Sequence, residues 1–201
     1  CTAQVLLAIV SGMYAVYHGS EGLIEIAKRI NNLTNRLAIS LKSSGYKIFH
    51  DSFFDTIRME VGSYEWRNLA IEKKINFRDY GDGTIGISID ETTTDLGLKD
   101  ILFIFNAKEI DRTTSSIPVN LLRKSKFLEN PVFRCHRTET KMMRYLHQLE
   151  MKDLSLNTSM IPLGSCTMKL NSATEMEALS WPSFVNIHPF APIEQTKGYE
   201  N

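Results

Sequence analysis

The residues best suited to chemistry gather in one short run, Met160–Asn171, which has the sequence MIPLGSCTMKLN. A proline and a glycine interrupt regular structure there, while Ser165 and Thr167 offer hydroxyl groups and Lys169 adds a cation. Successive backbone N–H groups in such a turn can form an anion-binding nest, and hydroxyls, N–H groups and a lysine suit a phosphate or a carboxylate. The run therefore predicts an anion or cofactor loop. An ordinary polar connection is the alternative.

Nucleophilic and metal chemistry have weaker support. Cys166 would need a nearby base or a strongly positive environment to form a thiolate, and His188 lies far along the chain. The other cysteines, Cys1 and Cys135, are too distant for a disulfide framework or a CxxC metal site, and the five histidines show neither HxH nor HxxxH spacing. We therefore expect no metal site, and a reducing compartment is the simpler interpretation.

Composition excludes several classes of protein. The 201 residues are 43% hydrophobic, which is enough for a core and unlike a disordered chain. Lys plus Arg and Asp plus Glu number 23 each, so no net field attracts nucleic acid or anionic lipid. We expect neither nucleic acid nor a membrane among the partners.

The opening segment is apolar but too short for a membrane span. The run Val5–Tyr17 is only 13 residues long and includes Ser11 and Gly12. A run of that length is more often a buried helix than a span, so we expect a helix packed on several sides that ends near His18-Gly19. Because the chain begins with Cys1 and no basic segment precedes the apolar run, we expect an internal piece of a longer product.

Changes in the hydrophobic period predict a small α+β domain over residues 19–107. Apolar residues spaced three and four apart indicate helices, alternation indicates half-buried strands, and the Asp-Gly in the turn at 81–83 is typical of a hairpin. An antiparallel sheet with helices on one face satisfies this order of elements. In chain order we expect a helix over 23–41, strands over 46–50 and 53–61, a short helix over 63–74, a hairpin of strands 75–80 and 84–90, and a helix capped by Thr94 or Asp95.

The remainder predicts a linker followed by an extended, partly helical arm. Residues 108–126 begin with a Thr-, Ser- and Asp-rich stretch without periodicity, which is typical of a linker. Thr138 can cap a helix through Glu150 whose methionines we interpret as core-filling. Ser172 and Glu175 have the spacing of a capping box, and Trp181-Pro182 should end the short helix that follows. No sheet is expected beyond residue 126.

Ten short segments resemble one enzyme family, both in their amino-acid sequences and in their order along the chain. They are CTAQ at 1–4, YHGS at 17–20, HD at 50–51 with FFDT at 53–56, INFR at 75–78, DGTIGIS at 82–88, DETTT at 90–94, ETKMMRY at 139–145, LEMKDLSL at 149–156, IPLGSCTMKLN at 161–171 and NIHPF at 186–190. The family is the P-protein of the glycine cleavage system, a glycine decarboxylase that depends on pyridoxal 5'-phosphate (PLP). The run at 161–171 argues against another PLP enzyme, such as an aminotransferase, that shares only the small domain.

The resemblance implies two homologous halves of PLP fold type I. Residues 1–18 would then be a helix of a neighbouring large domain, 19–107 the small α+β domain of the first half, 108–126 a linker, and 127–201 the N-terminal arm of the second half. Ser165, Cys166, Thr167 and Lys169 would lie near the cofactor or the substrate. The family's PLP-binding lysine lies beyond the position of Asn201, so this chain alone is expected to be inactive.

The same resemblance implies a reaction and its partners. Glycine would be decarboxylated on PLP and its aminomethyl group passed to the lipoyl arm of the H-protein, with reduction of the lipoyl disulfide. Further partners would be the remainder of the P-protein, in a homodimer or a heterotetramer. The compartment would be the mitochondrial matrix in a eukaryote and the cytoplasm in a bacterium. The alternative is a non-catalytic subunit or scaffold that completes the active site of a partner.

Overall fold

The computed structural model describes residues 4–62, 65–112, 114–155, 158, 160 and 172–199. The chain divides into two compact units, of which one is His18–Phe133 and the other combines Cys1–Tyr17 with Arg134–Asn201. Helices and a small sheet are both present, so the α+β class expected from the sequence is confirmed.

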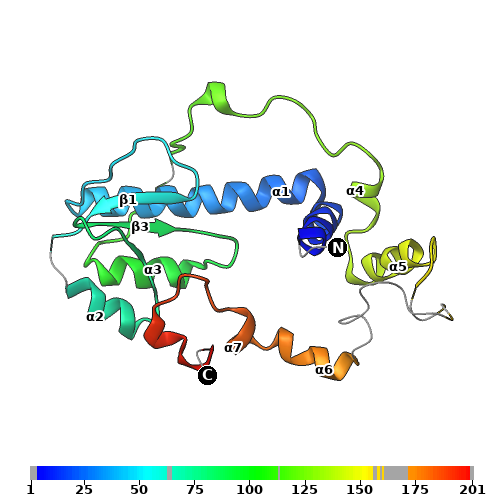
Figure 1. Ribbon diagram of the computed structural model, residues 1–201. Helices are drawn as coiled ribbons and strands as arrows, with labels where there is room; N and C mark the ends of the chain where they lie inside the picture. Colours follow the sequence, from blue (N-terminus) through cyan, green and yellow to red (C-terminus); the bar gives the residue numbers. More distant parts are fainter. Residues whose placement is uncertain are drawn as a thin grey trace. The chain divides into compact units, whose positions relative to one another are not determined.

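A three-stranded antiparallel sheet forms one layer of the His18–Phe133 unit (Figure 1). The strand order is β1–β3–β2, and an isolated bridge from Ile48 to Met59 adds a short segment beside β1. The predicted hairpin is confirmed, although its first strand is only two residues long. The elements of this part are α1 (Gln4–Ser43), β1 (Thr56–Glu60), α2 (Glu65–Glu72), β2 (Arg78–Asp79), β3 (Thr84–Ser88), α3 (Asp95–Ile104) and the 3-10 turn η1 (Val119–Leu121).

Alternation along the strands builds the core from one face of the sheet. Ile57, Met59, Ile85 and Ile87 are each at most 2% exposed, and all four point to the same side because strand side chains alternate. Helices α1, α2 and α3 cover this side and leave the other face to solvent. Their main contributions to the same cluster are Leu33, Leu37 and Leu41 of α1, Trp66 and Ala70 of α2, and Leu98, Ile101 and Leu102 of α3.

Helix α1 is two helices joined across a break at Gly19. That glycine has φ 63° and ψ −175°, whereas the rest of Gln4–Ser43 is helical. Only glycine adopts such a backbone conformation without large strain. The helix end predicted at His18-Gly19 is therefore present as a kink at Gly19, and a second helix follows it directly.

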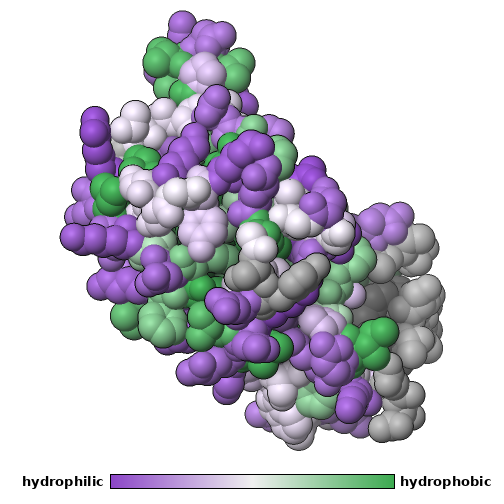
Figure 2. Space-filling view, turned by 90° about the vertical axis from the view of Figure 1, so that its left-hand side faces the viewer, coloured by the Kyte–Doolittle hydropathy of each residue, from purple (hydrophilic) through white to green (hydrophobic). Residues whose placement is uncertain are grey.

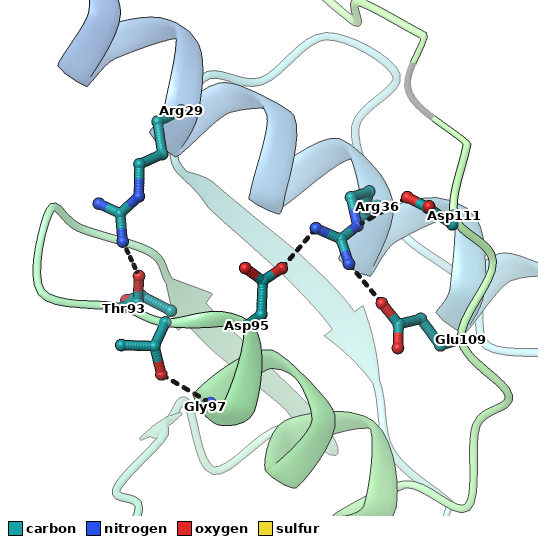
Figure 3. Close-up of polar contacts among 8 residues, drawn as sticks. Arg29, Arg36, Thr93, Asp95, Gly97, Glu109 and Asp111 are labelled. Carbon is teal, nitrogen blue, oxygen red and sulfur yellow. Dashed lines mark hydrogen bonds and ion pairs between the residues drawn. The ribbon is translucent and has the colours of Figure 1, made fainter.

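Two arginines of α1 fix the loop that leads into α3 (Figure 3). Arg29 donates to the backbone carbonyls of Glu91 and Thr93. Arg36 pairs with Asp95 at 2.6 Å and also with Glu109. These carboxylates raise the pKa of Arg36, mainly through the hydrogen bond to Asp95. Since Thr94 caps α3 by accepting from the N–H of Gly97 at 3.1 Å, the start of α3 is held by both local and long-range contacts.

The C-terminal part of the other unit is helical and has little burial. Thr138 caps α5 as predicted, and Ser172 with Glu175 forms the predicted capping box. Trp181 follows the end of this helical segment, but Pro182 then opens one more short helix. The elements are α4 (Val132–Cys135), α5 (Glu139–Glu150), α6 (Ala173–Glu177), η3 (Ala178–Ser180), α7 (Pro182–Val185), η4 (Ile193–Gln195) and η5 (Lys197–Tyr199).

The apolar start of α1 departs from expectation. We expected this segment to be packed on several sides, yet Leu6 and Leu7 are 66% and 67% exposed. Length and composition predict the helix correctly, but burial requires a packing surface that the described residues do not supply. Within the described ranges, no helix combines the length and the apolar content that crossing a membrane requires.

Candidate functional site

The four residues predicted to lie near a cofactor, Ser165, Cys166, Thr167 and Lys169, fall outside the described residues. The described chain resumes at Ser172, whose hydroxyl accepts from the N–H of Glu175 in the capping box. The anion-loop prediction therefore stays a prediction.

His50 and Asp51 form no catalytic pair. Both are exposed, and Asp51 forms an ion pair with Lys42 at 3.1 Å. Among the described residues, no group of three or more His, Cys, Asp or Glu side chains could hold a metal ion. Chemistry in the described part must therefore be sought among other side chains.

A cluster of charged and aromatic groups lies on the outer face of the sheet. Arg58 projects from β1 with its guanidinium carbon 5.2 Å from the ring centre of Phe49 and 4.6 Å from that of Tyr80. The ammonium nitrogen of Lys47 lies 5.2 Å from the ring centre of Phe49, and the guanidinium carbon of Arg78 lies 5.9 Å from the ring centre of Tyr80. Cations and rings thus alternate across the segment 47–49, β1 and β2, with Gly86 of β3 between Arg58 and Arg78. We call Lys47, Phe49, Arg58, Arg78 and Tyr80 the cation–aromatic face.

Strand alternation explains why these side chains meet. Ile48 bridges to Met59 in the core, so Lys47 and Phe49 on either side of Ile48 must point outward, as Arg58 does beside Met59. Gly86 is opposite Arg78 in the register. A Cβ at Gly86 would come within 2.9 Å of the Tyr80 hydroxyl, so the absence of a side chain there lets the tyrosine ring lie against the sheet.

The hairpin turn supplies one carboxylate to this region, Asp82, and Asp79 of β2 lies on the opposite side of the sheet. Asp82 binds the Arg58 guanidinium at 2.6 Å and accepts from the Thr84 hydroxyl at 2.5 Å. The Thr84 hydroxyl is the main cause of the lowered pKa of Asp82, with a further contribution from Arg58. Asp79 likewise has a lowered pKa, mainly because Arg67 donates to it. Both carboxylates therefore stay ionised and paired at neutral pH.

A shallow hollow of about 590 Å³ opens beside the cation–aromatic face. Lys47, Arg58 and Phe49 line it together with the backbone of Gly45 and Gly83. Its volume is typical of a ligand pocket, but its charges are already matched, since Lys47 pairs with Glu60 at 2.6 Å and Arg58 with Asp82.

The described hollow does not fit PLP, the group that the sequence resemblance implies. PLP needs a lysine for the imine, a partner for the pyridinium nitrogen and a stacking group for the ring. Lys47 is exposed and paired with Glu60, and the ring of Phe49 is flanked by Lys47 and Arg58. An incoming cofactor ring would have to displace those cations.

Sequence analysis missed the cation–aromatic face, although a signal was present. Outward positions of the expected strands carry Lys47, Phe49, Arg58, Arg78 and Tyr80. Each is unremarkable alone, because charged and aromatic residues are common on exposed strand faces. Only the register between strands places them in one stack.

Comparison with known proteins gives a consistent result along the whole chain. The family model described as "Glycine cleavage system P-protein" matches residues 1–105. A protein of Thermosynechococcus vestitus named "Glycine dehydrogenase (decarboxylating)" is 49% identical over 204 residues, covering 100% of this chain and 21% of that protein. Mitochondrial proteins of the same name from Gallus gallus and Homo sapiens are 46% and 45% identical, each again over 100% of this chain and 21% of the relative. The chain thus spans about a fifth of the length of these relatives.

Proposed function

Because the chain belongs to the glycine cleavage system P-protein family, we propose that it forms part of a glycine dehydrogenase that decarboxylates glycine with PLP and passes the aminomethyl group to a lipoylated H-protein. The observation that supports the proposal is identity of 45–49% along the entire chain to proteins named for glycine decarboxylation. The alternative, a non-catalytic scaffold, has no comparable support.

The proposed organisation follows PLP fold type I. Residues 1–18 belong to a neighbouring large domain, 19–107 form the small domain of the first half, 108–126 link the halves, and 127–201 begin the second half. The apolar and exposed start of α1 supports the first assignment, since an exposed row of Val, Leu and Ile side chains needs a covering surface.

In this proposal the residues near 165–169 form one wall of the active-site cavity of the complete enzyme. Ser165, Cys166, Thr167 and Lys169 lie near the cofactor or the substrate, where hydroxyls and a cation suit phosphate or carboxylate oxygens. The lysine that forms the imine belongs to residues other than these 201. Because the hollow on the sheet does not fit PLP, the proposal assigns no cofactor contact to the cation–aromatic face.

Partners and compartment follow from the same proposal. Glycine is the substrate, the lipoylated H-protein accepts the aminomethyl group, and the remaining polypeptide assembles as a homodimer or a heterotetramer. The relatives include mitochondrial proteins and a cyanobacterial protein. We therefore assign the mitochondrial matrix to a eukaryotic source and the cytoplasm to a bacterial one.

A substitution in the loop tests this function. In the complete polypeptide, Thr167→Val removes a hydroxyl from the proposed anion loop, and we expect PLP affinity or glycine turnover to fall roughly tenfold, because a hydrogen bond to a charged group contributes about 1.5–3 kcal/mol. PLP titration by absorbance and carbon dioxide release from glycine measure the two effects.

Two further variants complete this test. Thr174→Val changes an exposed threonine of α6 and should leave both quantities unchanged. Lys169→Ala should retain the imine absorbance, because another lysine forms the imine. If Thr167→Val has the PLP affinity and the glycine turnover of the wild type, the loop has no role at the cofactor. If Lys169→Ala loses the imine absorbance, the proposal that another lysine forms the imine is wrong.

A further inference from the structure

We propose that Arg36 is a positioning residue that fixes the segment after α3 to α1, so that the chain leaves the small domain at residue 116 rather than at 107. We call residues 109–112 of this segment the strap. The inference rests on the proposed function only for the role of 108–126 as the link between two halves. The contacts of the strap come from the structure itself.

The guanidinium of Arg36 joins carboxylates from two different segments (Figure 3). It pairs with Asp95 of α3 at 2.6 Å and with Glu109 of the strap, and its Nε lies 3.5 Å from the Asp111 carboxylate. The side chains of Arg36 and Glu109 are 17% and 27% exposed, whereas that of Asp111 is 90% exposed. Because solvent weakens an exposed ion pair, the pair with Glu109 holds the strap and Asp111 adds little.

The backbone of the strap is held by the same helix. The N–H of Ile110 donates to the hydroxyl of Ser40 at 2.9 Å, and Ser40 is fully buried. Arg36 and Ser40 are four positions apart in α1, so one face of the helix presents both contacts. Further along, the hydroxyl of Ser116 donates to the carbonyl of Phe53 at 2.7 Å. The chain is therefore attached to the core at 109–110 and again at 116.

Apolar burial does not hold this segment in place. None of the described residues between 108 and 118 is buried. On the side of the molecule turned toward the viewer in Figure 2, the described residues are mainly hydrophilic and the hydrophobic ones form small separate groups. That side therefore has no broad apolar surface on which a segment could pack. Ordering a segment costs conformational entropy, so the polar contacts of the strap must offset that cost.

The second part of the predicted linker is different. Residues 118–126 are all exposed, and their polar contacts are local, as when Leu121 donates to the carbonyl of Pro118 and Arg123 to the hydroxyl of Ser125. The linker thus divides into a first part that contacts the core and a second part that contacts itself. In the proposed organisation, only the second part can adjust its path between the two halves.

Hydrogen exchange followed by mass spectrometry tests the role of Arg36. In the complete polypeptide, Arg36→Gln should raise the exchange rate of the strap amides roughly tenfold, because a hydrogen bond to a charged group is lost. Arg36→Lys keeps the charge without the planar guanidinium and should raise the rate about threefold. Exchange over 121–126 should be the same in all three proteins. A wild-type rate across the strap in Arg36→Gln would overturn the proposal.

Arg29→Gln is the matched control. Arg29 lies on the same helix and donates to the backbone carbonyls of Glu91 and Thr93, which are outside the strap. We expect its replacement to leave the exchange rate of the strap unchanged. Equal acceleration of the strap by Arg29→Gln and Arg36→Gln would mean a general loosening around α1, and would overturn the proposal.

Glu109→Gln decides the matter even if Arg36→Gln unfolds the domain, because it changes the strap and no core side chain. It should speed exchange across the strap and leave β3 unaffected. The double variant should exchange no faster than Arg36→Gln alone, since both changes remove one interaction. Additive effects, or a wild-type rate in Glu109→Gln, would overturn the proposal. The expected exchange rates in a polypeptide that releases no carbon dioxide from glycine would refute the proposed function and leave the role of Arg36 intact.

Discussion

Helices α3 and α5 have the same kind of N-terminal cap but differ in how far their side chains are buried. Thr94 accepts from the N–H of Gly97 at 3.1 Å and Thr138 from the N–H of Lys141 at 3.3 Å. Both helices carry apolar residues at helical spacing. Yet α3 buries Leu98, Ile101, Leu102 and Ile104, whereas α5 has no buried residue among those described.

The difference shows that local signals form a helix without deciding its contribution to stability. Capping satisfies the free N–H groups of the first turn wherever the helix lies. Most helical stability in proteins comes from packing of the apolar face. Helix α3 has the sheet and α1 to pack against, whereas Met143 and Leu146 of α5 are 62% and 38% exposed. The apolar side of α5 therefore contributes little packing within the described residues.

The largest expected effect comes from a core leucine. Leu98→Ala should lower the unfolding free energy of the 201-residue chain by about 2–5 kcal/mol, because Leu98 is 0% exposed and its removal leaves a cavity. Leu146→Ala in α5 should cost less than about 1 kcal/mol. Denaturant unfolding followed by circular dichroism compares them, and equal losses would show that α5 is as well packed as α3.

The helix caps give an intermediate effect. Thr94→Ala should lower the unfolding free energy of the core by about 1 kcal/mol, since the start of α3 is tied to the sheet and to α1. Thr138→Ala should reduce helicity over α5 and leave the core transition in place. Hydrogen exchange by residue distinguishes the two results. A shift of the core midpoint with Thr138→Ala would mean that α5 unfolds together with the sheet.

The smallest expected effect is the contribution of Asp90 to folding stability at low pH. The pKa of Asp90, in the loop before α3, is lowered mainly by the hydroxyl of Thr92 and also by nearby backbone N–H groups. Because the folded pKa lies below the unfolded value of about 3.9, this carboxylate stabilises the fold above that pH. Its contribution is lost as the pH falls through the folded pKa.

Variants of this loop test the linkage. Asp90→Asn should be less stable than the wild type at pH 7, and the difference should vanish below the folded pKa. Thr92→Val should weaken the same pH dependence because it removes the main cause of the shift. A difference between Asp90→Asn and wild type that does not change with pH would contradict this account. Urea unfolding over a series of pH values measures it.

Expectation and structure agree at several local signals, although the strand expected over 75–80 is reduced to Arg78–Asp79 and that over 46–50 to one bridge. The alternation around Ile57 and Met59, the turn at 81–83, the caps at Thr94 and Thr138 and the break at Gly19 each depend on residues within a few positions of one another. Their backbone conformations are therefore specified over short distances. The predicted cofactor loop at 165–169 lies outside the described residues, so that part of the candidate site rests on sequence alone.

By itself, the amino-acid sequence determined the α+β class, the main helices, the hairpin and the family. The class, the helices and the hairpin follow because periodicity, capping and turn chemistry act over a few residues, whereas the family follows from resemblance to known sequences. Tertiary structure alone decided that Arg36 would bind both Asp95 and Glu109, that Arg58 would lie between Phe49 and Tyr80, and that α3 but not α5 would be buried. These contacts join residues 9 to 73 positions apart. Only the strand register and the packing of helices on the sheet bring such residues together.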